Sequence, residues 1–395
     1  MSVNIYQSAE LRRTTVKIAI VMNLDWPLKR YHKIFAGIKS YADKNTNWTV
    51  SWDPFPEIKL EKDPFYYNGI IGRCEFETIE KAQELNIPIV STWYSNLVPG
   101  LLSVFPDYYR SGELAAEAMV KRGYTNFVSI NYKGGTSDKL FLQGVASVLK
   151  PRKCQHKKYF IPRDLEKNKR KWEAMHDNFS SWIKDWELPI AIITSVCDLG
   201  PKISALCNEN NISIPEDAVL ISSDNDLAYC EGFSPTISSV NIDYFEVGQQ
   251  AAKMMDLKIK NQRIKEETLF IKPTGIVYRE STCHLSIADD VVRQAISFIS
   301  DNYQKNIQIN DVVRNFEISR RSLEKRFKDT VGHTIHEEIS RLRIETMKLL
   351  LLKTNKSIKV LSREAGYSSE YHMRRAFKLA TGMLPKEFRF DKRYR

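Results

Sequence analysis

The sequence predicts an α/β body followed by an all-α tail that carries two helix–turn–helix units. From residue 16 to 277, short apolar runs alternate with longer amphipathic stretches, which is typical of a parallel sheet covered by helices. From residue 306 to 390, the pattern is helical and repeats one plan twice. The chain has a net charge of +11, and residues 285–395 hold 23 Lys and Arg against 14 Asp and Glu. A near-neutral body with a basic tail indicates a polyanion-binding module on a globular domain.

The body follows a polar N-terminal tail, residues 1–15, and its elements succeed one another without long gaps. The predicted strands are 16–22, 48–52, 69–72, 87–92, 101–105, 126–131, 190–194, 218–222 and two short runs within 268–277. The predicted helices are 28–45, one that ends at 85, 108–122, 140–149, one that holds Trp172, Trp182 and Trp186, 200–210 and 244–258. Residues 151–171 are rich in Lys and Arg, but interleaved acidic residues favour a solvated edge strand and loop over a nucleic-acid patch.

The first helix–turn–helix unit is predicted to begin with a short helix at 311–316. A two-residue turn follows, and Ser319 can cap the second helix because its hydroxyl accepts a backbone N–H that has no helical partner. Leu323 and Phe327 are four residues apart and face inward. The other side chains of the second helix are mostly basic and are left on its outer face.

The second unit repeats this plan after residue 356. Ser357 caps a short helix, Gly366 makes the turn, and Ser368 caps a longer helix that ends near residue 380. Between the two units, residues 335–352 form one helix of roughly 27 Å. That length could hold two reading helices about one DNA turn apart, the ~34 Å that major-groove readers in series require.

This tail resembles the AraC-type DNA-binding domain. The matching letters are 319–328 (SRRSLEKRFK), Gly332, 341–343 (RLR), 349–350 (LL), 365–369 (AGYSS), 375–378 (RAFK), Gly382 and Pro385. The candidate DNA-binding residues lie on or beside the outer faces of the two longer helices: Arg320, Arg321, Glu324, Lys325, Lys328, Ser369, Glu370, Tyr371, Arg374, Arg375 and Lys378. The alternative is a small helical bundle with a solvated basic face, which the repeated plan disfavours.

The body resembles the two-lobed periplasmic-binding-protein fold used by LacI-type regulators. The residues that carry this resemblance are Asp107, Glu113, Ala115, Ala116, Gly123, Tyr124, 221–226 (ISSDND), 235–240 (PTISSV), Gly248, Ala251 and Ala252. The resemblance implies a sugar-sensing domain over residues 16–278. Its expected parts are lobe 1 at 16–123 and 239–265, lobe 2 at 124–238 and 266–278, a linker at 279–287 and the AraC-type domain at 288–395.

A sensor of this kind followed by an AraC-type tail is similar to the xylose operon regulators. This resemblance implies a sugar-responsive, sequence-specific transcriptional regulator, an activator of a pentose operon with xylose as the first candidate effector. Phe141 stands where the family commonly brings an Arg to the sugar, so another pentose or a hexose stays open. The implied partners are double-stranded operator DNA, a small sugar effector, a second copy of the chain in a homodimer and, for an activator, RNA polymerase.

The candidate ligand-binding residues are those that follow predicted strands, because ligands of open parallel sheets bind outside the carboxyl ends of the strands. They are Asp25, Trp26, Arg73, Asp107, Asp138, Asp224, Asn225 and Asp226. Asp107 and Asn225 are the expected anchors for sugar hydroxyls, and Trp26 is the expected stacking ring. Asp107 and Asp138 can equally be helix N-caps, and Trp26 can be a turn residue or a core plug.

Composition and motifs point away from secreted, membrane and catalytic proteins. Residues 1–15 lack the apolar core of an export signal, and no run reaches the length of a membrane span. The six cysteines form no CxxC pair and no zinc-type cluster. We therefore expect a cytoplasmic, nucleoid-associated protein that makes no membrane contact.

The sequence holds no GxSxG, Walker A or GxGxxG motif. His333 and His336 are three residues apart and lack the HExxH order of a zinc site, so they are expected to be surface or capping residues. The chain is therefore predicted not to be an enzyme and to need neither metal nor cofactor. The alternative function is a carbohydrate-binding or carbohydrate-modifying protein with a basic helical scaffolding tail, and DNA binding at low salt separates the two.

Overall fold

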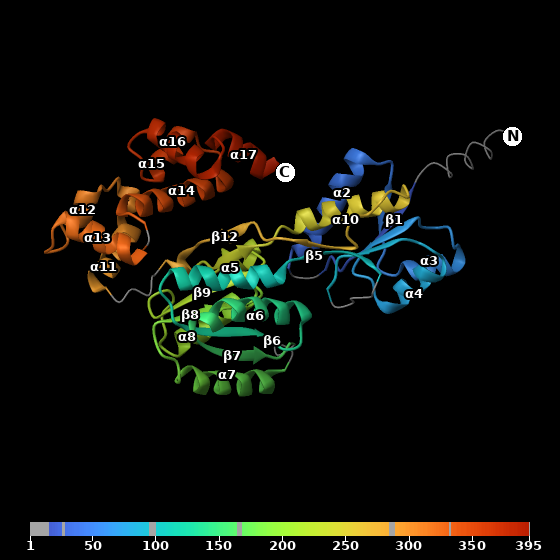
Figure 1. Ribbon diagram of the computed structural model, residues 1–395, viewed down its shortest axis with the longest axis horizontal. Helices are drawn as coiled ribbons and strands as arrows, with labels where there is room; N and C mark the ends of the chain where they lie inside the picture. Colours follow the sequence, from blue (N-terminus) through green and yellow to red (C-terminus); the bar gives the residue numbers. More distant parts are fainter. Residues whose placement is uncertain are drawn as a thin grey trace.

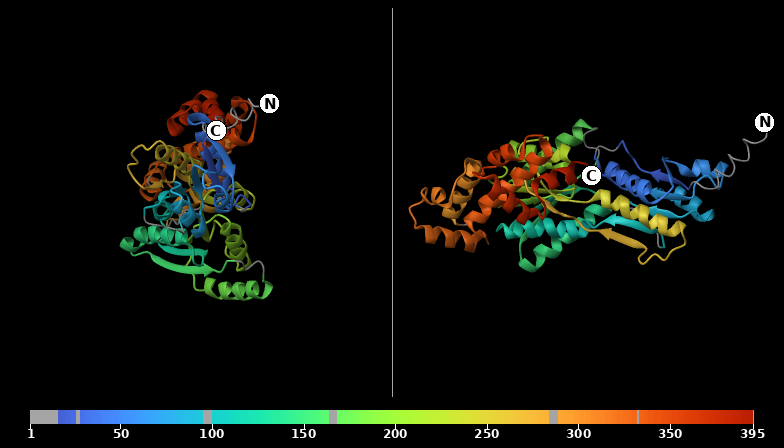
Figure 2. Two further views of the ribbon diagram at one scale, coloured as in Figure 1. Left: turned by 90° about the vertical axis from the view of Figure 1, so that its right-hand side faces the viewer. Right: turned by 90° about the horizontal axis from the view of Figure 1, so that it is seen from above.

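The computed structural model describes residues 16–25, 28–94, 100–163, 168–283, 289–331 and 333–394. It confirms an α/β body followed by a helical tail (Figure 1). The body consists of two lobes, each built on one six-stranded sheet. Seen from above in Figure 2, the helical tail lies toward one end of the long axis and lobe 1 lies at the other.

Lobe 1 is a parallel sheet between two pairs of helices. Its strands, in sheet order, are β11 (Thr268–Ile271), β5 (Leu102–Pro106), β4 (Ile89–Ser91), β3 (Gly69–Gly72), β1 (Lys17–Val21) and β2 (Thr49–Trp52). Helices α2 (Arg30–Asn45) and α10 (Tyr244–Ile259) pack on one face, and α3 (Pro56–Lys62) and α4 (Phe76–Glu84) pack on the other. Because both faces are covered, strands such as β1 (KIAIV) read as continuous apolar runs.

Lobe 2 repeats this three-layer plan. Its sheet order is β12 (Gly275–Val277), β10 (Ser238–Asn241), β9 (Ala218–Ser223), β8 (Ile190–Ile193), β6 (Asn126–Tyr132) and β7 (Gln155–Ile161), and only the β12–β10 pair is antiparallel. Helices α5 (Tyr108–Lys121) and α6 (Thr136–Leu149) cover one face, while α7 (Lys169–Ile183) and α8 (Leu199–Glu209) cover the other. A short helix, α9 (Leu227–Cys230), follows β9. The basic run at 151–171 contains the edge strand β7, as its composition predicted.

The chain crosses between the lobes at different points from those predicted. Helix α5 and strand β10 were assigned to lobe 1 but belong to lobe 2, and β11 was assigned to lobe 2 but joins β5 of lobe 1. The reason is that hydrophobic periodicity shows that a strand exists but not which sheet it joins. In the structure the crossings follow β5, β10 and β11, and these three segments connect the two lobes.

The predicted linker at 279–287 is also partly a packed element. A single 3-10 turn, Glu280–Thr282, lies against β9 and β10, with Ser281 and Thr282 fully buried. The Ser281 hydroxyl donates to the Leu220 carbonyl over 2.6 Å and accepts the Ser238 N–H over 2.9 Å. The described part of this segment is therefore fixed to lobe 2, and residues 284–288 lie outside the described residues.

The tail forms a helical domain with the two units joined by one long helix. Its helices are α11 (Asp290–Asn302), α12 (Ile309–Val313), α13 (Arg320–Val331), α14 (Ile335–Lys353), α15 (Ile358–Glu364), α16 (Glu370–Thr381) and α17 (Pro385–Tyr394). Two cores flank α14: Leu323 and Phe327 belong to one, and Met373 and Phe377 belong to the other. All four side chains face inward as predicted, whereas α11 was not predicted.

Two of the three predicted helix caps and the predicted turn glycine agree with the structure. Ser319 and Ser357 each accept a backbone N–H of the helix that they precede, and Gly366 adopts a left-handed φ of +87° in the turn. The predicted cap Ser368 is wrong, because α16 begins one residue later and its N-cap is Ser369, which makes no side-chain cap hydrogen bond. Because Ser368 and Ser369 are adjacent and equally suited to cap a helix, the sequence pattern does not show which of them is the N-cap.

The buried side chain of Arg343, on α14, holds the two units together. Its Nε donates to the Tyr303 carbonyl over 2.8 Å, and one Nη donates to the Ile307 carbonyl over 3.1 Å, both in the first unit. Its guanidinium also lies 5.6 Å from the ring centroid of Tyr367 in the second unit. The turn at Gly366 packs so closely on the first unit that a Cβ there would lie 2.3 Å from the Tyr303 carbonyl oxygen.

We therefore predict that Gly366→Ala loosens the joint between the two units. The left-handed φ costs an alanine about 1–3 kcal/mol, and the clash is with backbone, which cannot rotate away. Hydrogen exchange of α15 and α16 in the full chain should become faster, because local opening becomes easier.

Gly382→Ala is the matched control for that variant. Gly382 also has a left-handed φ of +76°, but no atom lies within 4 Å of where its Cβ would be. Hydrogen exchange of α15 and α16 should change less in Gly382→Ala than in Gly366→Ala. Equal effects in the two variants would show that the close approach of Gly366 to Tyr303 is unimportant.

Candidate functional site: the interlobe cleft and two exposed basic helices

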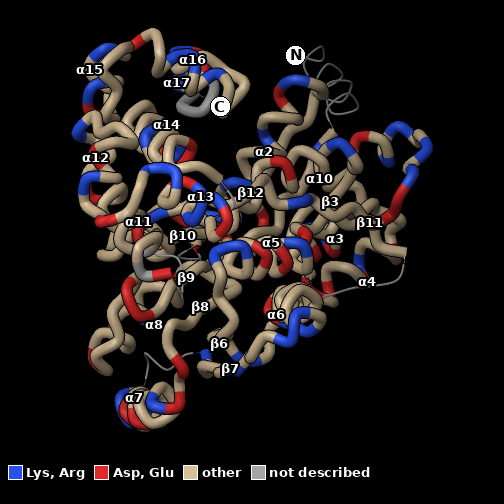
Figure 3. The backbone as a smooth tube through the Cα atoms, turned by 60° about the vertical axis from the view of Figure 1, so that its left-hand side comes forward, with Lys and Arg blue, Asp and Glu red and all other residues tan. Residues whose placement is uncertain are grey.

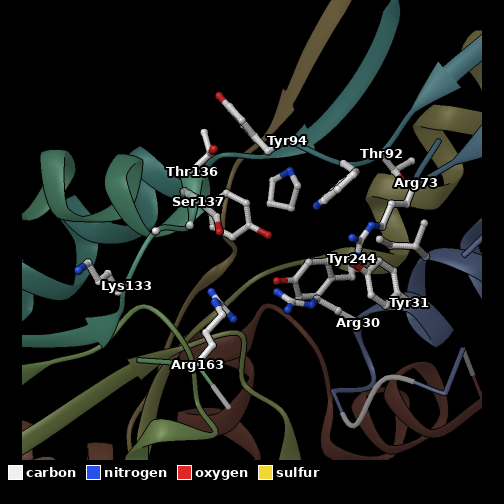
Figure 4. A pocket seen from close by; sticks show the side chains of 16 residues that line it. Arg30, Tyr31, Arg73, Thr92, Tyr94, Lys133, Thr136, Ser137, Arg163 and Tyr244 are labelled. Atoms are coloured by element: carbon white, nitrogen blue, oxygen red, sulfur yellow. The ribbon is translucent and has the colours of Figure 1, made fainter. Parts of the chain in front are cut away.

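A cavity of about 420 Å3 lies between the two lobes, where loops after strands and starts of helices meet (Figure 4). Its described lining is Arg30, Tyr31, Ile34, Arg73, Thr92, Trp93, Tyr94, Pro106, Tyr108, Lys133, Gly134, Gly135, Thr136, Ser137, Arg163 and Tyr244. Figure 4 shows the side chains of Arg30, Arg73 and Arg163 pointing toward one space, whereas Lys133 points away from it. Cavities of this size suit small ligands.

A group of buried polar side chains behind this cleft connects the two lobes. Asp224, at the end of β9 in lobe 2, accepts a hydrogen bond from the Tyr244 hydroxyl of lobe 1. Its other oxygen lies 3.8 Å from the guanidinium of Arg30, also of lobe 1. Burial raises the pKa of Asp224, which the charge of Arg30 opposes, and burial also raises the pKa of Tyr108 to about 12. The Asp224 carboxyl is thus committed to a contact between the lobes.

Two buried polar atoms of the lining have no hydrogen-bond partner among the described residues. They are the Nε of Arg30 and the hydroxyl oxygen of Thr92. A buried donor without an acceptor costs about 1–3 kcal/mol. These atoms are therefore available to a ligand, and their cost is a physical reason to expect one.

The structure brings one of the predicted ligand residues, Arg73, into the described lining. Two others contact a lining arginine from behind: Asp224 contacts Arg30, and Asp138 accepts from Arg163 over 3.0 Å. Asp25 lies in an exposed turn, and Trp26 lies outside the described residues.

The remaining three predicted ligand residues already have protein partners. Asp107 caps α5 by accepting the Arg110 N–H over 2.8 Å. Asp226 caps α9 through one oxygen and accepts the Lys29 N–H of lobe 1 through the other, over 2.7 Å. Asn225 donates to Asn241 over 2.9 Å and accepts from Arg279 over 2.9 Å. Asp107 thus acts as a helix N-cap, which was the alternative prediction for this residue. Asn225 makes its polar contacts within lobe 2 and its C-terminal segment.

Sequence reasoning missed Arg30 and Tyr244 because it looked for residues directly after strands. It missed Arg163, which does follow β7, because residues 151–171 were interpreted as a solvated edge strand and loop. Arg30 and Tyr244 instead open the helices α2 and α10. In a parallel sheet, helices begin near the carboxyl ends of the strands, so the first turn of each predicted helix was an available signal.

The predicted DNA-binding residues lie on helices α13 and α16 or at the start of α16. Arg320, Arg321, Lys325 and Lys328 are exposed on α13. Tyr371, Arg374, Arg375 and Lys378 are exposed on α16, while Glu324, Ser369 and Glu370 are half-buried. Figure 3 shows Lys and Arg recurring on the helices of this domain.

Ion pairs divide these cations into two groups. Arg320 pairs with Glu324 at 3.0 Å and Arg374 pairs with Glu370 at 2.7 Å, each one turn apart on its own helix. The described residues offer no ion pair or hydrogen bond to the side chains of Arg321, Lys325, Lys328, Arg375 and Lys378. By contrast, Arg326 is held by two hydrogen bonds of 2.7 Å to Asp289. The unpaired cations are the ones free to contact phosphate or bases.

The helical domain touches lobe 2 through the aromatic ring of Tyr278. The guanidinium of Arg122, at the end of α5, lies 4.2 Å from the ring centroid, and that of Arg341, on α14, lies 6.0 Å from it. Arg122 also donates to the Thr282 carbonyl over 3.3 Å. Helix α14, which joins the two helix–turn–helix units, is therefore in contact with the lobe that forms one wall of the cleft.

Glu338 anchors Arg341 at this junction. It accepts hydrogen bonds of 2.6 and 2.8 Å from Arg341 and lies 2.8 Å from the Nε2 of His333. Burial alone would raise the pKa of Glu338, but hydrogen bonds from Arg341 and His333 outweigh it and lower the pKa to about 2. His333 thus has a structural partner, as its predicted surface or capping role implied.

Two domain families match this chain. The periplasmic binding protein-like domain family matches residues 116–282, and the helix-turn-helix domain family matches residues 312–390. In the described part of the chain, no helix combines the length and hydrophobicity needed to cross a bilayer.

Relatives match over nearly the full length. The "Xylose operon regulatory protein" of Haemophilus influenzae is 26% identical over 392 residues, which is 95% of this chain and 98% of that protein. Among solved structures, a xylose-binding transcription activator, xylR, covers 95% of this chain and 98% of its own, with 22% identity and a TM-score of 0.58. A LacI family transcriptional regulator from Enterococcus faecium with bound ribose covers 67% of this chain and 98% of its own, with 18% identity and a TM-score of 0.55. The two structural likenesses show the fold.

The geometry around Glu338 predicts an acid-sensitive helical domain. The pKa of Glu338 is lower in the folded chain than its ordinary value of about 4.3. The ionised carboxylate therefore stabilises the fold at pH values above about 4.3, and this stabilisation is lost as the pH falls toward about 2. Glu338→Gln should lower the stability of the helical domain at pH 7 by about 3 kcal/mol, because Arg341 loses its anion. The variant should also lose less stability on acidification than the unchanged chain. Differential scanning calorimetry at several pH values measures both.

Glu337→Gln is the control, since Glu337 is exposed in the same turn and only caps Thr334. If the two variants unfold alike at every pH, the buried network around Glu338 does not stabilise the domain.

Proposed function

We propose that the chain is a sugar-responsive, sequence-specific DNA-binding transcriptional regulator, like the xylose operon regulatory proteins to which it is similar over about 95% of its length. The observation that carries this proposal is the repeated unit of the helical domain. Each unit exposes one helix with unpaired cations, Arg321, Lys325 and Lys328 on α13 and Arg375 and Lys378 on α16. Basic side chains on the second helix of such a unit suit the DNA major groove.

The cleft is the proposed sensor. A ligand can shift the lobes only by binding one arrangement more tightly than another. Arg30 and Arg73 belong to lobe 1 and Arg163 to lobe 2, so a ligand held by all three favours a closed cleft. Closure moves lobe 2, and the contact of Tyr278 with Arg122 and Arg341 passes that movement to α14.

The finer features of the proposal follow the relatives. We propose that the chain activates a pentose-utilisation operon, that it works as a homodimer on double-stranded operator DNA, and that it contacts RNA polymerase there. It acts in the cytoplasm at the nucleoid and catalyses no reaction. The relatives are named for the xylose operon, so pentoses are the first effectors to test.

The experiment that tests the function is fluorescence anisotropy with DNA from upstream of the chain's own gene. We expect binding at low salt that weakens steeply as salt rises, because cations displace counterions from phosphate. We also expect one sugar to change the affinity for this DNA but not for random DNA. A folded chain that binds no DNA at low salt would refute the proposal.

Arg321→Ala and Arg375→Ala separate base reading from phosphate contact. If these side chains read bases, each variant should lose about 1–3 kcal/mol of binding energy on operator DNA and less on random DNA. Equal losses on both DNAs would make them phosphate contacts. Arg263→Ala is the control, because it removes the same charge from an exposed position of the body and should change neither affinity.

A further inference from the structure

We propose that the effector of the cleft is an acidic sugar, one that carries a carboxylate or phosphate group, rather than a neutral one. This inference rests on the proposed function of a sugar-responsive regulator, but it replaces the neutral pentose suggested by the relatives with an acidic sugar. It follows from the charge and hydrogen-bonding character of the described lining, which is rich in cations and donors.

Three guanidinium groups reach the cleft from three separate elements. Arg30 opens α2, Arg73 follows β3, and Arg163 follows β7, so the set draws on both lobes. Figure 4 shows them directed at the same space. Arg30 is the most buried of the three, with 18% of its side chain exposed, and its Nε has no partner among the described residues. Guanidinium groups bind carboxylates and phosphates through paired hydrogen bonds, which makes them the residues of choice for such anions.

The rest of the lining adds donors but no charged acceptor. A guanidinium and the indole N–H of Trp93 can only donate hydrogen bonds, and the hydroxyls of Thr92, Thr136 and Ser137 can donate as well as accept. Neither a carboxylate nor a side-chain amide is among the described lining residues. Each hydroxyl of a neutral sugar has a proton to donate, and the side-chain acceptors in the described lining are hydroxyl oxygens alone, those of Thr92, Thr136, Ser137, Tyr31, Tyr94, Tyr108 and Tyr244. An anionic group offers acceptors alone, which matches this lining.

Carboxylates lie near the three arginines but leave much of their hydrogen-bonding capacity free. Asp138 and Asp224 are both buried behind the arginines, with 2% and 3% exposed. Asp138 bonds directly to Arg163, whereas Asp224 stays 3.8 Å from Arg30 and accepts a hydrogen bond from Tyr244. Arg73 lies 3.5 Å from the mostly exposed Glu75, a weak surface pair, and 3.7 Å from the ring centroid of Trp93. The N–H groups of Arg30 and Arg73 can therefore still donate to an incoming anion.

Helix α6 adds a second feature that favours an anion. Its first residues, Thr136 and Ser137, line the cleft, and no side chain caps its N-terminus. The first N–H groups of such a helix are donors without a helical partner. The buried carboxylate of Asp138 in the first turn offsets their partial positive charge, so this end of α6 contributes N–H donors rather than net charge.

Isothermal titration calorimetry of the full chain tests the inference with matched pairs of sugars. Glucuronate is compared with glucose, galacturonate with galactose, xylonate with xylose, and ribose 5-phosphate with ribose. We expect at least one acidic sugar to bind about tenfold or more tightly than its neutral counterpart, as one charge-assisted hydrogen bond allows. The carboxylate and phosphate arms identify which anion the arginines accept. Raising the salt concentration should weaken only the acidic member of the pair.

Arg163→Gln and Arg73→Gln are the variants of choice, because both side chains are partly exposed and their loss should leave the fold intact. Each should reduce the affinity for the acidic sugar about ten- to a hundredfold, with a smaller effect on the neutral one. Arg263→Gln serves as the matched charge control and should leave the affinity unchanged. Circular dichroism confirms that each variant is folded.

The outcomes separate this inference from the proposed function. If a neutral sugar binds more tightly than every acidic one and alters DNA binding, the acidic effector is refuted and the regulator stands. The inference also fails if the folded chain binds DNA but none of the acidic sugars. A chain that binds an acidic sugar but no DNA would support the inference and refute the regulator.

Discussion

One buried guanidinium, that of Arg343, holds the helical domain in a single arrangement. It lies in the middle of α14 and donates to two carbonyl oxygens of the first unit while it faces Tyr367 of the second. An arginine cannot lose its charge inside a protein, so moving the units apart would leave that charge buried without acceptors. The close packing of Gly366 on Tyr303 adds a steric constraint in the same direction. The two exposed basic helices therefore behave as parts of one body.

The same long helix connects this body to the sensor. Arg343 faces the DNA-binding units, whereas Arg341, two residues earlier, faces Tyr278 and lobe 2. Glu338 holds Arg341 in place, and Arg122 approaches the same ring from α5. Helix α5 begins beside the cleft at Tyr108 and ends at this junction, so one rigid element extends from the ligand cavity to the contact with α14. A change in lobe arrangement has a short physical route to the DNA-binding surface.

The sequence predicted more of the fold than of the cleft, and particular residues show why. The apolar strands, the inward Leu323, Phe327, Met373 and Phe377, and the left-handed Gly366 follow from local periodicity and backbone preference, which the sequence expresses directly. The lobe that each strand joins depends on contacts between distant segments, so α5, β10 and β11 were misassigned.

The cleft shows the same limit at the level of single side chains. Asp107 and Asp226 follow strands, but each carboxylate accepts N–H groups of the protein: Asp107 caps α5, and Asp226 caps α9 and also accepts the Lys29 N–H of lobe 1. Arg30 and Arg163 come from segments 133 residues apart, and only the folded chain brings them together. The basic helices were easier to predict, because exposure on a helix is a local property.

Hydroxyl-radical footprinting on the upstream DNA tests the central claim most directly, that α14 presents two reading helices to DNA as one rigid body. The account predicts two protected segments per copy of the chain, about 10 base pairs apart and on one face of the duplex. A single protected segment per copy, or two on opposite faces, would contradict it.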